Sequence, residues 1–184
     1  PGSVDPRILR ERANLEQTPA ELRRMHLSDA EEPDECHFLI SNAFRGAHNI
    51  YTMHVPSHYA WSVDQTEMSE AYAYYRLQLQ SLQSRTPGRR WVLKSSPHLL
   101  HLDELHAALP GAHYVQFHRD PLAVIASNCQ LTLLLREMRS DDVSRQEIGE
   151  SVVRLLRDYV TRTLRFRDRC VTRPWVDVDF EEFV

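Results

Sequence analysis

The segment FHRDPLAVIAS, residues 117–127, constrains the fold of this chain more than any other stretch. It continues an apolar run, residues 112–117, of the kind that forms a strand. Asp120 and Pro121 then occupy the two positions that begin many helices, the N-cap and the first helical residue. The pattern therefore predicts a buried strand that leads directly into a helix.

This predicted junction brings together groups that bind anions. Arg119 follows the strand, and Ser127 stands eight residues later, inside the helix. A guanidinium offers several N–H donors, and a helix start offers N–H groups that have no partner within the helix. The sequence therefore predicts an anion pocket formed by Arg119, the first turn of the helix and Ser127.

A second cation, Lys94, follows an earlier apolar run at the start of the segment WVLKSSPH, residues 91–98. Buried parallel strands read as continuous apolar runs, so Lys94 is predicted to lie at the carboxyl end of another strand. Leucines between the two runs recur at helical spacing, and Pro110 with Gly111 ends that helix. A strand, helix, strand unit of this length would bring Lys94 and Arg119 to one edge of a parallel sheet.

These segments resemble the middle of sulfotransferases that use 3′-phosphoadenosine 5′-phosphosulfate (PAPS). The resemblance is to the bacterial-type branch, which has an LKSPxH strand end and an HRDP segment, and it covers most of residues 18–135. It implies an α/β fold with a P-loop-like parallel sheet flanked by helices. It also implies transfer of a sulfuryl group from PAPS to a hydroxyl or amine acceptor by in-line displacement, without a metal.

The resemblance implies roles for individual residues. By motif position, Arg119 and Ser127 would bind the 3′-phosphate of the cofactor, and Lys94 would touch the sulfuryl group in transfer. The base that takes the acceptor proton stays open: His98, Glu31, Glu32 and Glu35 are candidates within the chain. The resemblance also allows a base outside this sequence, just after the phosphosulfate-binding loop with which the family begins.

One family feature is absent from the printed sequence. The family begins with a strand and a loop of the type PRSGTT that holds the 5′-phosphosulfate, and nothing similar occurs here. We therefore expect an internal fragment of one partial domain, residues 1–184, that lacks the first strand and this loop. Its own transfer activity is expected to be absent. Residues 1–63 are expected to form a helical or irregular cover, and residues 64–184 the α/β core.

Further elements follow from periodicity and end signals. Asp64 and Glu67 resemble a cap for a long helix that ends before Pro87. Other helices are predicted at residues 33–44 and at residues 145–169. The alternating run WVDVDF, residues 175–180, is typical of an edge or end strand and would be the third parallel strand.

Composition excludes several classes of protein. The net charge of −4 argues against a nucleic-acid surface, and no apolar run approaches the roughly 20 residues of a membrane span. Three cysteines without metal-ligand spacing favour reduced thiols and a cytoplasmic location. The ten histidines show no metal-binding motif, so no metal is expected.

Two alternatives remain at this level. His118, Arg119 and Asp120 also spell the HRD of protein kinases, but Ile125 stands where a kinase has its magnesium-binding Asn, and no DFG or VAIK element occurs. The second alternative is a non-catalytic nucleotide-binding or interaction module that retains the 3′-phosphate pocket. The acceptor and the oligomeric state are not indicated by the sequence.

Overall fold

The computed structural model describes residues 4–26, 28–47, 49–170 and 175–183. The chain divides into two compact units, Pro1–Glu35 and Cys36–Val184. The first unit contains α1 (Pro6–Gln17) and α2 (Ala20–Met25). Asp5 begins α1 because its carboxylate accepts a hydrogen bond from the backbone N–H of Arg7 at 2.8 Å.

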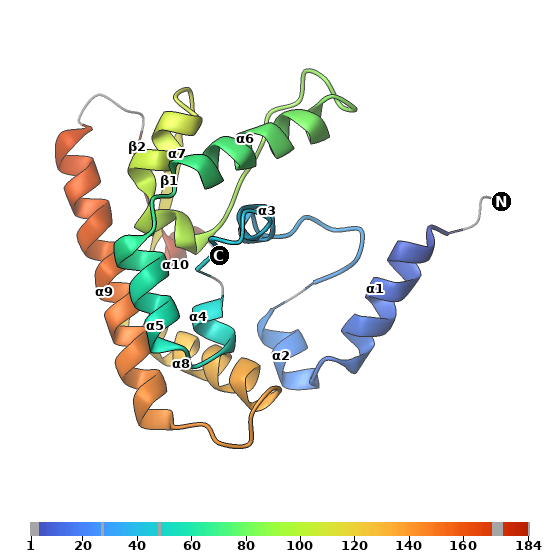
Figure 1. The fold of residues 1–184 in the computed structure, drawn as a ribbon, viewed down its shortest axis with the longest axis vertical. Coiled ribbons are helices and arrows are strands. Elements are labelled where there is room, and N and C mark those ends of the chain that lie inside the picture. The colour runs from blue at the N-terminus through green and yellow to red at the C-terminus, as the bar shows by residue number, and fades with distance from the viewer. Residues whose placement is uncertain (1–3, 27, 48, 171–174, 184) are drawn as a thin grey trace. The chain divides into compact units, whose positions relative to one another are not determined.

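The second unit is mostly helical and contains a small parallel sheet (Figure 1). Its early elements are short: α3 (His37–Ser41), α4 (Asn49–Thr52), α5 (Pro56–Tyr59) and the π-helical turn η1 (Ala60–Gln65). The later ones are α6 (Ser69–Gln83), the 3₁₀ turn η2 (Ser96–Leu100), α7 (Leu102–Ala108), β1 (Tyr114–His118), α8 (Pro121–Glu137), α9 (Arg145–Arg169), β2 (Trp175–Asp179) and α10 (Phe180–Phe183).

The sheet confirms two of the predicted strands. Strands β1 and β2 are parallel, with Tyr114 opposite Trp175 and His118 opposite Asp179. The carboxyl ends of both strands therefore lie at one edge, where β1 leads into α8 and β2 into α10. Helix α9, drawn in orange in Figure 1, matches the predicted range of residues 145–169 and begins at Ser144, whose side chain accepts from the N–H of Glu147.

The predicted strand at residues 91–94 is wrong for the structure. Residues 91–95 pair with no strand among the described residues, so the described sheet has two strands rather than three. The segment is instead held by Leu93, which packs on the core, and by the carbonyl of Lys94, which accepts from the N–H of Cys36 at 2.9 Å. An apolar run becomes a strand only where a neighbouring strand can take up its backbone hydrogen bonds.

The core lies between α6, α3, α7 and α9. Tyr72, Tyr75 and Phe166 are almost completely buried there, which confirms the predicted apolar face of α6. The predicted cap is wrong: α6 begins at Ser69, and the Asp64 carboxylate lies 3.3 Å from a guanidinium nitrogen of Arg162. The Asp64 carboxylate thus forms an ion pair with Arg162 of α9 instead of a helix cap.

Candidate functional site

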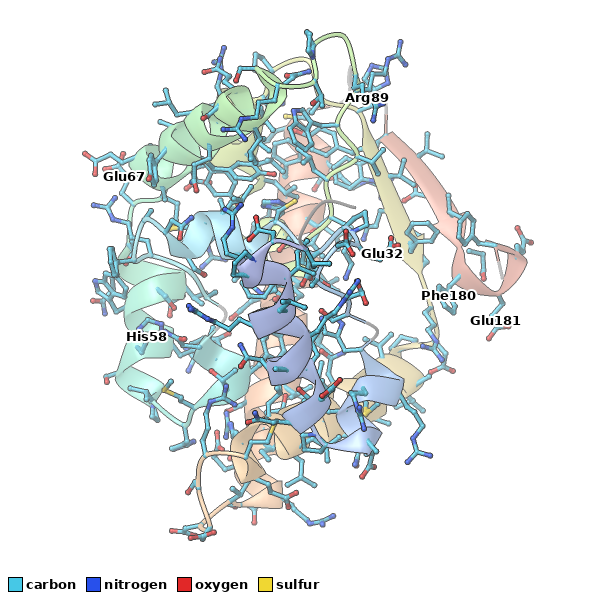
Figure 2. All side chains as sticks on the ribbon, turned by 90° about the vertical axis from the view of Figure 1, so that its right-hand side faces the viewer. Glu32, His58, Glu67, Arg89, Phe180 and Glu181 are labelled. Carbon is cyan, nitrogen blue, oxygen red and sulfur yellow. The ribbon has the colours of Figure 1, made fainter. Side chains whose placement is uncertain are left out.

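Arg119 lies where the sequence placed it, directly after β1 and before α8. Its side chain is exposed, and its guanidinium carbon lies 5.0 Å from the centre of the Phe180 ring. Figure 2 shows Phe180 where β2 turns into α10. The ring therefore supports the cation at the carboxyl edge of the sheet by a cation–π contact.

The first turn of α8 differs from the predicted anion pocket. The Asp120 carboxylate accepts from the N–H groups of Leu122 at 2.6 Å and Ala123 at 3.0 Å, and the Asp120 carbonyl accepts from Val124. Pro121 has no N–H group. The amides expected to bind an anion are therefore satisfied by Asp120, and an anion here would depend on side chains.

Ser127 is exposed on α8, two turns after the helix start. With a rise of about 1.5 Å per residue, it stands roughly 9 Å along the axis from Pro121. An Arg119 side chain that leaves Phe180 could turn toward α8 and share one phosphate with Ser127. The pairing of Arg119 with Ser127 on one ligand stays a prediction.

Lys94 is exposed at the end of the 91–94 segment, and the extended residue Ser95 follows it and begins η2. Because its backbone is bonded to Cys36 and its neighbour Leu93 packs on the core, the point from which its side chain leaves is well defined. Lys94 is also the only lysine of the chain. Its convergence with Arg119 stays a prediction.

His98 is buried rather than open to an acceptor. Only 8% of its surface is exposed, and its Nδ1 lies 2.9 Å from the hydroxyl of Tyr72. Burial raises the pKa of Tyr72 far above its usual value, so this hydroxyl keeps its proton. The geometry suits a residue that holds the turn after Lys94 better than it suits a base that meets an acceptor.

The hydrogen bond between Tyr72 and His98 can be tested through stability. We expect Tyr72→Phe to lower the free energy of unfolding by about 1–2 kcal/mol, because the substitution removes a buried partner of the imidazole. Urea denaturation measures the change. Tyr74→Phe, on the exposed side of the same helix, is the matched control and should change stability little. Equal losses in both variants would contradict the importance of this bond.

His101 lies beside His98 and is also buried. Burial, and then the positive charge of Arg162, lower the pKa of His101 to about 4. The ordinary value in an unfolded chain is about 6.5, so the unfolded state takes up the proton first as the pH falls. The neutral imidazole therefore favours the folded state fully above about pH 6.5, and this contribution is lost on the way down to about pH 4.

The contribution of His101 to stability can be measured by lowering the pH. We expect His101→Gln to lose less stability than the wild type between about pH 6.5 and pH 4, where one such imidazole contributes a slope of at most about 1.4 kcal/mol per pH unit. Urea denaturation at several pH values measures the slope. His113→Gln, at an exposed position, is the control. Parallel slopes for His101→Gln and wild type would contradict the shifted pKa.

The sequence reasoning missed a charged group at the sheet. Asp177 of β2 accepts from Arg167 of α9 through both carboxylate oxygens at 2.7 Å, and it lies 2.7 Å from Nε2 of His118 on β1. The hydrogen bonds from Arg167 and then from His118 hold the pKa of Asp177 well below its usual range. The alternation of apolar and acidic residues at 175–180 indicates a strand with exposed carboxylates, but it does not predict which side chains pair with Asp177.

The other base candidates lie in the first unit. Glu31 pairs with Arg12, whose guanidinium nitrogen lies 2.6 Å from its carboxylate, and both side chains are exposed. Glu32 and Glu35 are exposed or half-buried. Their role as a base therefore stays a prediction.

No cluster of three metal-ligating side chains occurs among the residues that the structure describes. The helices of the described residues are too short or too polar to cross a membrane.

Comparisons with known proteins agree with the resemblance. The chain is similar to the sulfotransferase STF9 from Mycobacterium avium in its crystal structure, with 28% identity and a TM-score of 0.86. The match covers 98% of this chain and 47% of that one, so the chain spans about half the length of this relative. No curated protein matches the sequence.

The structural match confirms the expected sulfotransferase-type α/β fold, of which the small parallel sheet is one part. It also argues against the protein-kinase alternative, and Asp120, which would be the kinase base, is used as a helix cap. The Sulfotransferase family matches over residues 3–184. Because this match extends over nearly the whole sequence, the chain belongs to the sulfotransferase family.

Proposed function

We propose that this chain provides the 3′-phosphate site and the sulfuryl-contacting cation of a PAPS-dependent sulfotransferase. The observation that carries the proposal is the position of Arg119, at the carboxyl edge of two parallel strands and directly before the helix that bears Ser127. Family membership supports PAPS as the donor. The acceptor would supply a hydroxyl or an amine.

In this proposal Arg119 and Ser127 hold the 3′-phosphate of PAPS. A guanidinium can give two parallel hydrogen bonds to one phosphate, and the serine hydroxyl adds a third donor. The contact with Phe180 supports the cation at the sheet edge. Asp120 already accepts from the N–H groups of Leu122 and Ala123, so in this proposal the two side chains are the main donors to the phosphate.

Lys94 would act on the group that is transferred. The acceptor oxygen or nitrogen attacks sulfur in line, the bond from sulfur to the phosphate oxygen breaks, and adenosine 3′,5′-bisphosphate leaves with the electron pair. A base removes the acceptor proton. Negative charge grows on the leaving phosphate, and a fixed ammonium beside it stabilises the transition state more than the ground state. The hydrogen bond between Tyr72 and His98 holds the turn that follows Lys94, which supports this role.

The chain taken alone is expected to transfer no sulfuryl group. The family loop that binds the 5′-phosphosulfate has no counterpart in the sequence, and isolated cations cannot replace its backbone amides. Incubation of the purified chain with ³⁵S-labelled PAPS and a mixture of alcohol, phenol and amine acceptors measures this. Robust labelling of any acceptor would contradict the expectation.

The second candidate is a non-catalytic nucleotide-binding module that retains the 3′-phosphate pocket of Arg119 and Ser127. Joining this chain to the part of STF9 that it does not cover separates the two. Turnover of PAPS by the joined protein would support an enzymatic parent, and binding of adenosine 3′,5′-bisphosphate without turnover would favour the module.

Cys36, Cys129 and Cys170 are free thiols, which supports a reducing, cytoplasmic location.

A further inference from the structure

Strands β1 and β2 end side by side, and the residues that follow them are in contact. His118 of β1 lies opposite Asp179 of β2, so Arg119 and Phe180 are the next residues of the two strands. The Arg119 guanidinium lies over the Phe180 ring at the point where β2 turns into α10 (Figure 2). The position of Arg119 therefore depends on how firmly the two strand ends are held together.

A side-chain hydrogen bond joins the two strands just before this point. Nε2 of His118 on β1 lies 2.7 Å from Oδ1 of Asp177 on β2. Hydrogen bonds from Arg167 and then from His118 hold the pKa of Asp177 well below its usual range, so its carboxylate is ionised. An ionised carboxylate only accepts hydrogen bonds, and the imidazole therefore donates through Nε2.

Asp177, the acceptor of this bond, is itself anchored by a helix. Arg167 of α9 donates to both of its carboxylate oxygens at 2.7 Å, and such a bidentate arrangement fixes the plane of the carboxylate. The guanidinium carbon of Arg167 also lies 4.9 Å from the centre of the Trp175 ring, and Nη1 lies 3.4 Å from Oε1 of Gln116. The partner of His118 is thus held by α9 and by contacts with both strands.

A different contact joins the opposite face of the strand ends. Successive side chains of a strand point to opposite faces, so Phe117 leaves β1 on the other side from His118. Its ring meets the ring of Phe183 of α10 edge to face, with 5.0 Å between the ring centres. An aromatic contact of this kind tolerates sliding, whereas a hydrogen bond to a charged group is directional. The bond from His118 therefore constrains the strand ends more closely.

We propose that His118 is a positioning residue for Arg119. By donating to Asp177 it holds the carboxyl end of β1 against β2, and this keeps the Arg119 guanidinium where it meets the 3′-phosphate. The inference rests on the proposed phosphate site and adds a role for the residue that precedes the arginine. A fixed backbone at Arg119 reduces the conformational entropy that is lost when the phosphate binds.

Isothermal titration calorimetry with adenosine 3′,5′-bisphosphate on the full-length protein tests this role. We expect His118→Phe, which keeps a ring but removes the donor, to weaken binding roughly three- to tenfold. His118→Gln, which retains a side-chain N–H for Asp177, should recover most of the affinity. Both variants should bind adenosine 5′-phosphate as the wild type does, which a general loss of structure would not allow. Asp103→Ala breaks an exposed ion pair with Arg169 of α9 and is the matched control, with unchanged affinity for the bisphosphate.

A double-mutant cycle shows whether His118 acts through Arg119. In an Arg119→Ala background, His118→Phe should cause no further loss of affinity for the bisphosphate. Equal losses in both backgrounds would overturn the proposal, and so would an unchanged affinity of His118→Phe in a protein where Arg119→Ala weakens binding. If Arg119→Ala itself has no effect, the proposed phosphate site is refuted, and the role of His118 is refuted with it.

Discussion

Replacing Lys94 with alanine is expected to lower kcat for sulfuryl transfer by roughly 100- to 1,000-fold in the full-length protein. The affinity for adenosine 3′,5′-bisphosphate should change much less, because the demand for the cation rises with the charge on the leaving group. The hydrogen bond between the Lys94 carbonyl and Cys36 holds the backbone from which this side chain leaves. Single-turnover kinetics with labelled PAPS separates transfer from binding.

Two controls sharpen this test. Arg90→Ala removes an exposed cation four residues earlier and should leave kcat within about twofold, since exposed charges at this distance are screened. Lys94→Arg keeps the charge but changes its shape, so it should restore only part of the rate. A Lys94→Ala protein with unchanged kcat would refute the role.

Replacing Arg119 with alanine is the second large effect. We expect the affinity for adenosine 3′,5′-bisphosphate to fall by roughly 10- to 150-fold, or about 1.5–3 kcal/mol, in the full-length protein. The effect should be large because Asp120 already occupies the amides of the first turn, which leaves Arg119 as the main donor to the phosphate. Isothermal titration calorimetry measures the affinity.

Comparison with adenosine 5′-phosphate assigns the effect to the 3′-phosphate. Arg119→Ala should bind this nucleotide as well as the wild type does, whereas Ser127→Ala should show a smaller loss with the bisphosphate alone. Arg157→Ala, an exposed arginine on α9, is the matched control. Equal affinity of Arg119→Ala and the wild type for the bisphosphate would show that the phosphate binds elsewhere.

Local patterns predicted the elements that have strong local causes. The cap at Asp120 and the proline at 121 placed the start of α8 correctly, and the periodicity of residues 145–169 gave the bounds of α9. The apolar face of α6 was correct for Tyr72 and Tyr75, although Leu82 is half exposed. In these cases a few neighbouring residues determine the backbone geometry, and more distant contacts do not overrule them.

Local patterns failed where the outcome depends on a distant partner. The run at residues 91–94 is as apolar as a strand, but a strand requires a neighbour, and the described residues provide none. The sequence pattern predicts open amides at the start of α8. In the structure the carboxylate of Asp120, the residue that marks this helix start, accepts from them. The sequence also does not show that His98 is buried and hydrogen-bonded to Tyr72, and its role as a base stays a prediction.

The sequence by itself determined the family, the two cationic motifs and the succession of strand and helix around Arg119, because these rest on the identity and spacing of nearby residues. Only the tertiary structure decided what each polar group contacts. It placed Arg119 on Phe180, buried His98 against Tyr72, and joined Asp177 to Arg167 and His118. Burial and hydrogen bonding between segments many residues apart are properties of the packed chain, and local sequence carries little information about them.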